Sequence, residues 1–144
     1  MSHIETIHHE GFDPEMKQVY VPAIRVVEGR LVFISGITAA PPYHHHPHRP
    51  EEFDSIPTDI EGQVERLFRH LDLALEAAGC RRSDIVALNR FFTNVRADQD
   101  VVNAYQGRWF GGHIPTSTSV EVKSLATDPR LRLEVSAIAV APPA

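Results

Sequence analysis

The sequence has a single cysteine and no long apolar run, and each of these absences excludes a class of protein. Cys80 has no partner within the chain, which excludes an intrachain disulfide framework and favours a reducing compartment. No stretch approaches the roughly 20 apolar residues of a membrane span, and the first residues lack the basic and apolar regions of a secretion signal. We therefore expect a cytoplasmic protein without a membrane partner.

Basic residues are outnumbered as well. The chain has 14 Lys and Arg residues against 19 Asp and Glu residues, which gives a formal net charge of −5, and the basic residues form no stripe. Proteins that bind duplex nucleic acid neutralise its phosphates with clustered Lys and Arg. The charge therefore argues against nucleic acid as the main partner.

What the chain does contain is the composition of an ordinary globular domain. Its 144 residues are 42% hydrophobic and 23% charged, and this length is sufficient to bury a core. We assign residues 1–144 to a single domain with a polar, unpatterned N-terminal arm at 1–18. Residues 37–57 form a loop insertion rich in His and Pro.

The pattern of apolar residues predicts seven elements in the order β-β-α-β-α-β-β. We expect strands at 19–27, 31–36, 84–95, 117–125 and 130–140, and helices at 58–78 and 98–110. The first two strands are expected to form a hairpin. Thr58 and Glu61 have the spacing of a capping box at the start of the first helix, and Gly79 is expected to end it.

This order predicts an α+β fold with one sheet and two helices on one face. The other face of the sheet carries apolar as well as polar residues. Self-association is the simplest way to cover such a face.

Several motifs in register with this order resemble the RidA/YjgF family. Together they extend from about residue 19 to residue 141. The matching segments are Tyr20-Val21-Pro22-Ala23, LVFISG at 31–36, Asp59-Ile60-Glu61-Gly62-Gln63, Asp84-Ile85-Val86, Asn103-Ala104-Tyr105, Pro115-Thr116-Ser117-Thr118-Ser119-Val120-Glu121-Val122 and Leu133-Glu134-Val135-Ser136-Ala137-Ile138-Ala139. No single motif is specific, but the ordered set is.

The resemblance implies a chorismate-mutase-like fold and a homotrimer whose sheets line a central barrel. It also implies small-molecule clefts between the subunits. Members of the family hydrolyse reactive enamines and imines to ketoacids and ammonia without a metal or cofactor. We therefore expect a small-molecule substrate, a homotrimer and no cofactor.

The resemblance further implies three catalytic residues. Glu134 falls on the family's glutamate that orients the attacking water, Tyr20 on the tyrosine that closes the pocket, and Ser119 on the position whose amide faces the ligand. Composition alone would instead make Glu134 an exposed or ion-paired strand residue.

The position of the family's substrate-binding arginine falls on Ser117. A hydroxyl cannot replace a guanidinium that grips a carboxylate with two parallel bonds, and losing a charge-assisted bond costs about 1.5–3 kcal/mol. Either another group holds the carboxylate, or the substrate has none. The predicted substrate-binding residues are Ser117, Thr118, Gly36 and Arg90, although the hydroxyl run around Ser117 could also be a simple polar strand edge.

Four arginines could replace the missing one, namely Arg25, Arg90, Arg108 and Arg132. We favour Arg90, which lies beside Asn89 in the third predicted strand. Most arginines, however, are surface residues that keep a protein in solution.

The segment from His44 to His48 holds four histidines in five positions. Histidine is a common metal ligand, but a run of histidines on a proline-rich loop mostly points outward. A metal site, a proton-handling or lid role, and a plain polar loop are the alternatives, and we predict no metal. Cys80, next to Arg81, is expected to be structural because no histidine or carboxylate motif accompanies it.

We expect a divergent hydrolase that adds water to a small enamine, imine or related unsaturated compound, with Glu134 moving the proton. The alternative is a trimeric metabolite-binding or regulatory protein that has lost the chemistry. An endoribonuclease or translation inhibitor, as some relatives are labelled, fits poorly with the net charge of −5.

Overall fold

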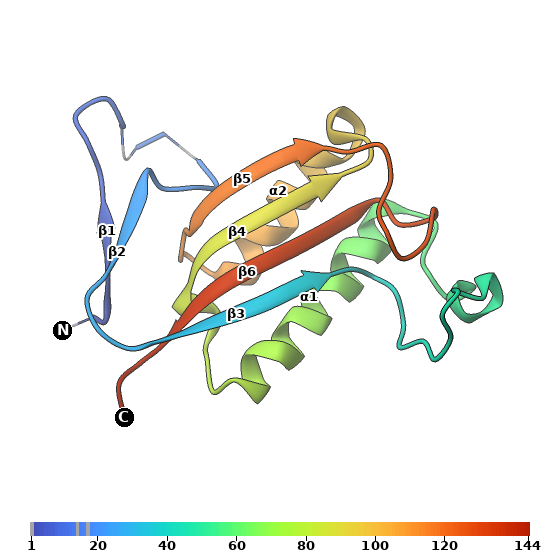
Figure 1. Cartoon of the computed structure of the whole chain (residues 1–144). Coiled ribbons are helices and arrows are strands. Elements are labelled where there is room, and N and C mark those ends of the chain that lie inside the picture. The colour runs from blue at the N-terminus through green and yellow to red at the C-terminus, as the bar shows by residue number, and fades with distance from the viewer. Residues whose placement is uncertain (1, 14, 17) are drawn as a thin grey trace.

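A computed structural model describes residues 2–13, 15–16 and 18–144 and shows an α+β fold (Figure 1). Two helices, α1 (Ile60–Ala77) and α2 (Val95–Phe110), lie on one face of a four-stranded sheet. The strands are β1 (Ile4–Ile7), β2 (Ala23–Val26), β3 (Arg30–Ile37), β4 (Ile85–Phe92), β5 (Thr116–Glu121) and β6 (Leu133–Ala141), and the short 3-10 helices are η1 (Pro50–Phe53) and η2 (Arg82–Asp84). The predicted class and the two helices on one face are confirmed.

The four-stranded sheet has the order β3-β6-β4-β5. β4 and β5 are parallel because α2 crosses between them, and the other neighbours are antiparallel. The last strand of the chain therefore lies inside the sheet, where it is buried along most of its length.

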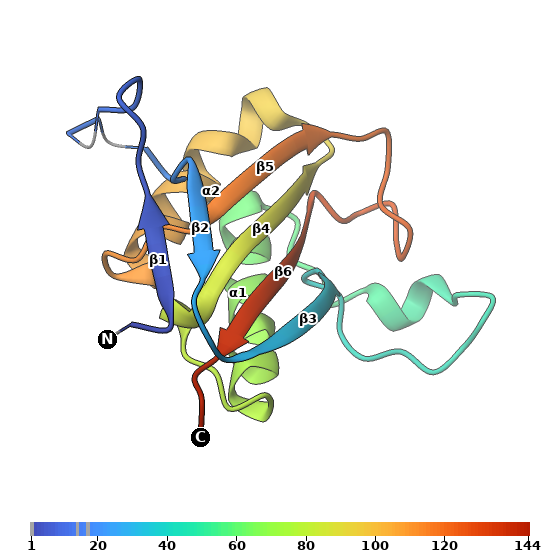
Figure 2. The same cartoon turned by 60° about the vertical axis from the view of Figure 1, so that its left-hand side comes forward.

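The prediction of one sheet with a β2–β3 hairpin is wrong. β2 pairs with β1 in a separate two-stranded sheet, and β3 pairs with β6 (Figure 2). Between β2 and β3, Gly29 has φ +116°, and a Cβ on it would lie 2.5 Å from the Ala141 carbonyl oxygen. The chain thus turns from one sheet into the other at a position that only glycine suits.

The N-terminal arm is also more regular than predicted, because it contains β1. His3, just before β1, lies against the body of the protein, with its Nε2 2.9 Å from the Val140 carbonyl oxygen and 3.0 Å from Asp84 Oδ1. Strand pairing with β2 and this histidine contact together order the start of the arm.

The capping box expected from Thr58 and Glu61 is not formed. Asp59 is the N-cap residue of α1, and no side chain caps the helix there. The buried side chain of Gln63 lies in the first turn of the helix, where its amide donates to the carbonyl oxygens of Pro57 and Arg130, each at 2.9 Å. The contact to Arg130 is long-range and joins the start of the helix to the segment before β6.

Other element ends shift by a few residues. Gly79 has φ +69° and follows α1 as predicted. β4 ends at Phe92, and α2 begins at Val95 instead of residue 98 because Asn94 caps it, accepting a hydrogen bond from the Ala97 N–H at 3.1 Å. β5 also ends earlier, and β6 begins later, than the sequence predicts.

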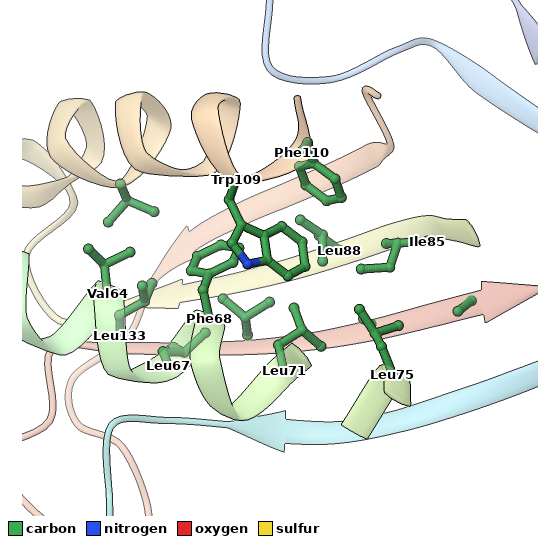
Figure 3. Packing of buried hydrophobic residues seen from close by; sticks show 14 of the residues in the cluster. Val64, Leu67, Phe68, Leu71, Leu75, Ile85, Leu88, Trp109, Phe110 and Leu133 are labelled. Atoms are coloured by element: carbon green, nitrogen blue, oxygen red, sulfur yellow. The ribbon is translucent and has the colours of Figure 1, made fainter. Parts of the chain in front are cut away.

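The core lies between the helices and the sheet (Figure 3). Burying each such apolar side chain contributes about 1.5–3 kcal/mol. The phenyl ring of Phe68 and the indole of Trp109 are centred 4.9 Å apart and join the two helices. The labelled members of the core are Val64, Leu67, Phe68, Leu71, Leu75, Ile85, Leu88, Trp109, Phe110 and Leu133.

The face of the sheet opposite the helices is bare in the single chain. Phe33 is 73% exposed and Leu31 55% exposed on β3, and Val120 is 42% exposed on β5. Across the described residues, neither helix combines the length and the apolar character of a membrane span.

Candidate functional site

Six of the seven predicted site residues line two separate pockets, and Thr118 lines neither. Tyr20, Arg90, Ser117 and Ser119 line the first, of about 260 Å³, together with Gln18, Val19, Gln99 and Asn103; we name it the Arg90 pocket. Glu134 and Gly36 line the second, of about 290 Å³, together with Ile37, Thr38, Ala40, Pro41, Tyr43, His70 and Thr127; we name it the Glu134 pocket.

Strand alternation explains the first pocket. In the parallel pair β4–β5, Arg90 lies opposite Ser119, and Leu88 opposite Ser117. Residues that lie opposite each other on neighbouring strands point to the same face of the sheet, and every second residue of a strand shares that face. Both serines therefore point to the side that α2 covers, as Leu88 and Arg90 do. Thr118 lies opposite the exposed Asn89, on the other face, so the structure separates it from the two serines with which it was grouped.

Arg90 is 2% exposed and is held by neutral groups. Its Nε–H donates to Ser119 Oγ at 2.8 Å, and its Nη1 donates to Asn103 Oδ1 at 2.8 Å and to Gln106 Oε1 at 3.2 Å. The carbon of the guanidinium lies 5.3 Å from the centre of the Phe92 ring. Burial lowers the pKa of Arg90 to about 10, so the side chain is still a cation at neutral pH.

Tyr20 forms the outer wall of the Arg90 pocket. It is 42% exposed, and its ring is T-shaped to Phe12 with the centroids 6.2 Å apart. The neighbouring Val21 N–H donates to the Pro115 carbonyl oxygen at 3.0 Å, which ties this segment to the start of β5. The placement of Tyr20 suits a side chain that covers a bound molecule.

A β-bulge shapes the Glu134 pocket. The β3–β6 register changes from Ile34 opposite Ala137 to Ile37 opposite Val135, so β3 carries one extra residue beside Glu134. A Cβ on Gly36 would lie 2.6 Å from Glu134 Oε2, so this carboxylate can rest against the strand only because residue 36 has no side chain.

Glu134 and Arg90 point to opposite faces of the sheet. Glu134 pairs with Phe91, whereas Arg90 pairs with Val135, and successive strand residues alternate between faces. Within one chain, the predicted water-orienting carboxylate and the predicted hydroxyls therefore do not share a pocket.

The His-rich insertion is a packed wall of the Glu134 pocket. Tyr43 lines that pocket, and its ring lies 5.3 Å from His46, 4.8 Å from His48 and 5.3 Å from Phe53, measured between centroids. His45 Nδ1 is hydrogen-bonded to a carboxylate oxygen of Glu52. Within the described ranges, no three His, Cys, Asp or Glu side chains are close enough together to hold a metal ion.

The other candidate arginines line neither pocket. Arg25 forms an exposed ion pair, Arg108 lies over the Tyr105 ring, and Arg132 is paired with Asp98. Cys80 is buried, and its pKa is raised first by that burial and then by the charge of Asp84, so its sulfur is kept as a thiol.

Several residues of the two pockets were not predicted from the sequence. On α2, Gln99, Asn103 and Gln106 follow one another at helical spacing and turn a polar stripe toward Arg90. A polar stripe on the inner side of a helix was the signal that could have revealed them. His70 contributes to the Glu134 pocket from α1, with its Nδ1 3.0 Å from the Thr38 carbonyl oxygen.

Comparison with known proteins gives one consistent family. Residues 12–141 match the model of the family described as Endoribonuclease L-PSP. The chain is 31% identical over 133 residues to protein DfrA of Myxococcus xanthus, covering 92% of each protein.

Two solved structures have the same fold. One is a Rid family protein of Yersinia pestis, with a TM-score of 0.78 and 22% identity, covering 96% of this chain and 99% of that one. The other is a member of the YjgF family from Mycobacterium tuberculosis, with a TM-score of 0.62 and 25% identity, covering 95% of this chain and 98% of that one.

Proposed function

This chain belongs to the Endoribonuclease L-PSP family, also called RidA/YjgF, and from that premise we propose that it hydrolyses small reactive enamines or imines. Membership of this family supports a function that involves small molecules. The observation that carries the proposal is Glu134, a carboxylate seated in a pocket against the bulge at Gly36.

The proposed reaction is the addition of water to a C=N bond. Glu134 accepts a proton from water as the water oxygen bonds to the imine carbon, and it returns that proton to the nitrogen, which has gained the electron pair of the C=N bond. In the resulting carbinolamine, the hydroxyl proton then moves to nitrogen through Glu134 as the C–N bond breaks, which releases ammonia and leaves a carbonyl group. An enamine enters the same sequence after protonation at carbon. Nothing is oxidised or reduced, so the proposal includes no cofactor.

Assembly of three chains would complete the cleft. Since the side chains of Arg90 and Glu134 point to opposite faces of one sheet, we place the Glu134 pocket of one subunit against the Arg90 pocket of its neighbour. The exposed Phe33, Leu31 and Val120 on the bare face supply apolar surface for this homotrimer. A solution mass equal to that of one chain would remove this arrangement.

The test is a rate measurement on enamines generated in situ by a pyridoxal-phosphate enzyme, followed by the release of ammonia and ketoacid. The wild-type protein should accelerate release above the spontaneous rate in buffer. Glu134→Gln should lower the rate roughly 100-fold or more, because a positioned proton acceptor contributes 10²–10⁴-fold. Glu65→Gln, a carboxylate change on the exposed side of α1, should leave it unchanged.

Two results would count against the hydrolase. A wild-type rate equal to the buffer rate would favour the alternative of a metabolite-binding protein that keeps the clefts without the chemistry. An unchanged rate in Glu134→Gln would remove Glu134 from the mechanism. A parallel RNA-cleavage assay at fixed salt tests the activity after which the family is named.

A further inference from the structure

Within the described residues of the single chain, Arg90 is a buried cation without a carboxylate partner. It is 2% exposed, and each hydrogen bond that its guanidinium makes to a described residue ends on a neutral oxygen, of Ser119, Asn103 or Gln106. No carboxylate in the described part of the chain forms an ion pair with it, and burial is the one cause that lowers its pKa.

Arg132, another arginine that contacts α2, has a carboxylate partner. Its Nη2 lies 2.5 Å from Asp98 Oδ1, and its Nε donates to Asp98 Oδ2 at 3.1 Å, so the charge is matched by a fully buried carboxylate. Both arginines contact α2, yet the helix offers an acid to Arg132 and only amides to Arg90.

An unmatched buried charge is strongly unfavourable, because the guanidinium loses water and gains no opposite charge in return. Neutral acceptors orient the group without neutralising it. Such a side chain is well suited to a counter-charge that arrives from outside the protein.

The pocket around Arg90 fits that role. Its lining within the described residues contains one cation, no carboxylate, and the hydroxyls and amides of Tyr20, Ser117, Gln18 and Gln99, each of which can donate a hydrogen bond. Nε and Nη1 are already bonded to protein oxygens, which leaves the hydrogens of Nη2 without a partner among the described groups.

We infer that the Arg90 pocket binds the carboxylate of a small molecule, with Arg90 as its counter-charge and the hydroxyl of Ser117 beside it. The charged group thus comes from β4 and reaches the pocket across Ser119, on the neighbouring strand. The inference rests on the proposed function only in placing this carboxylate on the enamine or imine substrate, and binding itself can be tested without turnover.

The test measures the binding of pyruvate by calorimetry in a buffer free of other small anions. Pyruvate should bind saturably, and its uncharged analogue pyruvamide should not. Arg90→Gln should weaken pyruvate binding about 10- to 100-fold, the effect of losing one charge-assisted bond. Arg108→Gln, the same change at an exposed arginine of α2, should bind like the wild type.

A measurement without mutation guards against a misfolded variant. In the wild-type protein, the NMR signal of the Arg90 Nε–H should shift as pyruvate is added and should stay in place with pyruvamide. Pyruvamide binding as tightly as pyruvate, no saturable pyruvate binding, or equal binding by Arg90→Gln would each overturn the inference. If inorganic phosphate binds and pyruvate does not, the inference of a carboxylate ligand is overturned and the pocket is assigned to a phosphate-bearing ligand.

The two proposals fail separately. If pyruvate binds through Arg90 but no enamine is hydrolysed, the carboxylate site stands and the hydrolase falls. If enamines with and without a carboxylate are hydrolysed equally well, and Arg90→Gln has no effect, the hydrolase stands and the carboxylate site falls.

Discussion

At the scale of single residues, two small side chains determine what the pockets can hold. Ser117 contributes only a short hydroxyl side chain to the lining of the Arg90 pocket, and Gly36 leaves room for the carboxylate of Glu134. At Gly36, the missing side chain lets the carboxylate of the neighbouring strand rest against β3.

Gly36→Ala should impair hydrolysis without unfolding the protein. The new Cβ would lie 2.6 Å from Glu134 Oε2, so the carboxylate must move, and a shift of about 1 Å in a catalytic group can cost up to roughly 100-fold in rate. Because the atoms displaced are the flexible end of a side chain, stability should change by less than about 1 kcal/mol. Steady-state kinetics and thermal unfolding would measure both effects.

Gly107→Ala is the matched control. Gly107 lies within α2, and its added Cβ would meet nothing within 4 Å. Alanine is favoured over glycine in a helix, so this variant should be more stable by roughly 0.5–1 kcal/mol with an unchanged rate. Equal rates for Gly36→Ala and the wild type would show that the resting position of Glu134 is unimportant.

The face of the sheet to which each strand residue points could be predicted from the alternation of residues in the sequence. Leu88, Arg90 and Phe92 alternate along one strand, which already places the arginine on the apolar, helix-covered face. The same rule separates Thr118 from its two serine neighbours. The lack of a carboxylate partner for Arg90 among the described residues could not be predicted, because it depends on which turn of α2 lies above the strand.

At the scale of elements, periodicity identified the two helices and the main strands, whereas strand pairing depended on distant segments. β3 pairs with β6, about 100 residues later, because the long apolar β6 is buried inside the sheet. Local turn residues suggested a β2–β3 hairpin, but the turn at Gly29 leads between two sheets. Local turn residues carry no information about pairing with a strand that is distant in the sequence.

The insertion at 37–57 is the element whose role the sequence left most open, with a metal site, a proton-handling or lid role and a plain polar loop as alternatives. In the structure, the rings of Tyr43 and His48 pack on Phe53, which is 1% exposed within a second apolar cluster. Tyr43 also lies at the edge of the Glu134 pocket. The insertion therefore contributes to the shape of that pocket.

Tyr43→Ala should raise KM for the substrate, because the wall of the Glu134 pocket loses its ring. The half-buried ring should also contribute to stability, so unfolding should require about 1–3 kcal/mol less. Tyr43→Phe keeps the ring and should retain most of the activity, and His44→Ala, an exposed change in the same loop, should have no effect. A normal KM in Tyr43→Ala would show that the insertion does not contact the substrate.

At the scale of the whole molecule, the Arg90 and Glu134 pockets of one chain are two proposed half-sites that do not meet within it. The sheet separates Arg90 from Glu134, and its bare face exposes Phe33 and Val120 to water. Both features have one economical explanation in cyclic assembly, in which every subunit gives one half-site to each neighbour. The proposed chemistry is thus a property of the interface.

Mixing the two impaired variants tests this arrangement directly. Glu134→Gln retains Arg90, and Arg90→Gln retains Glu134, so neither protein alone has a cleft with both native residues when a carboxylate-bearing enamine is the substrate. If the two residues come from adjacent subunits, random assembly of equal amounts would leave both native in about one quarter of the clefts. After the variants are unfolded and refolded together, hydrolysis at a substrate concentration well below KM should recover to about that fraction of the wild-type rate, while each variant refolded alone should stay at least roughly 10-fold below the wild type. A refolded mixture that is as inactive as its components, although mass measurement shows mixed trimers, would mean that Glu134 and Arg90 never act in the same cleft.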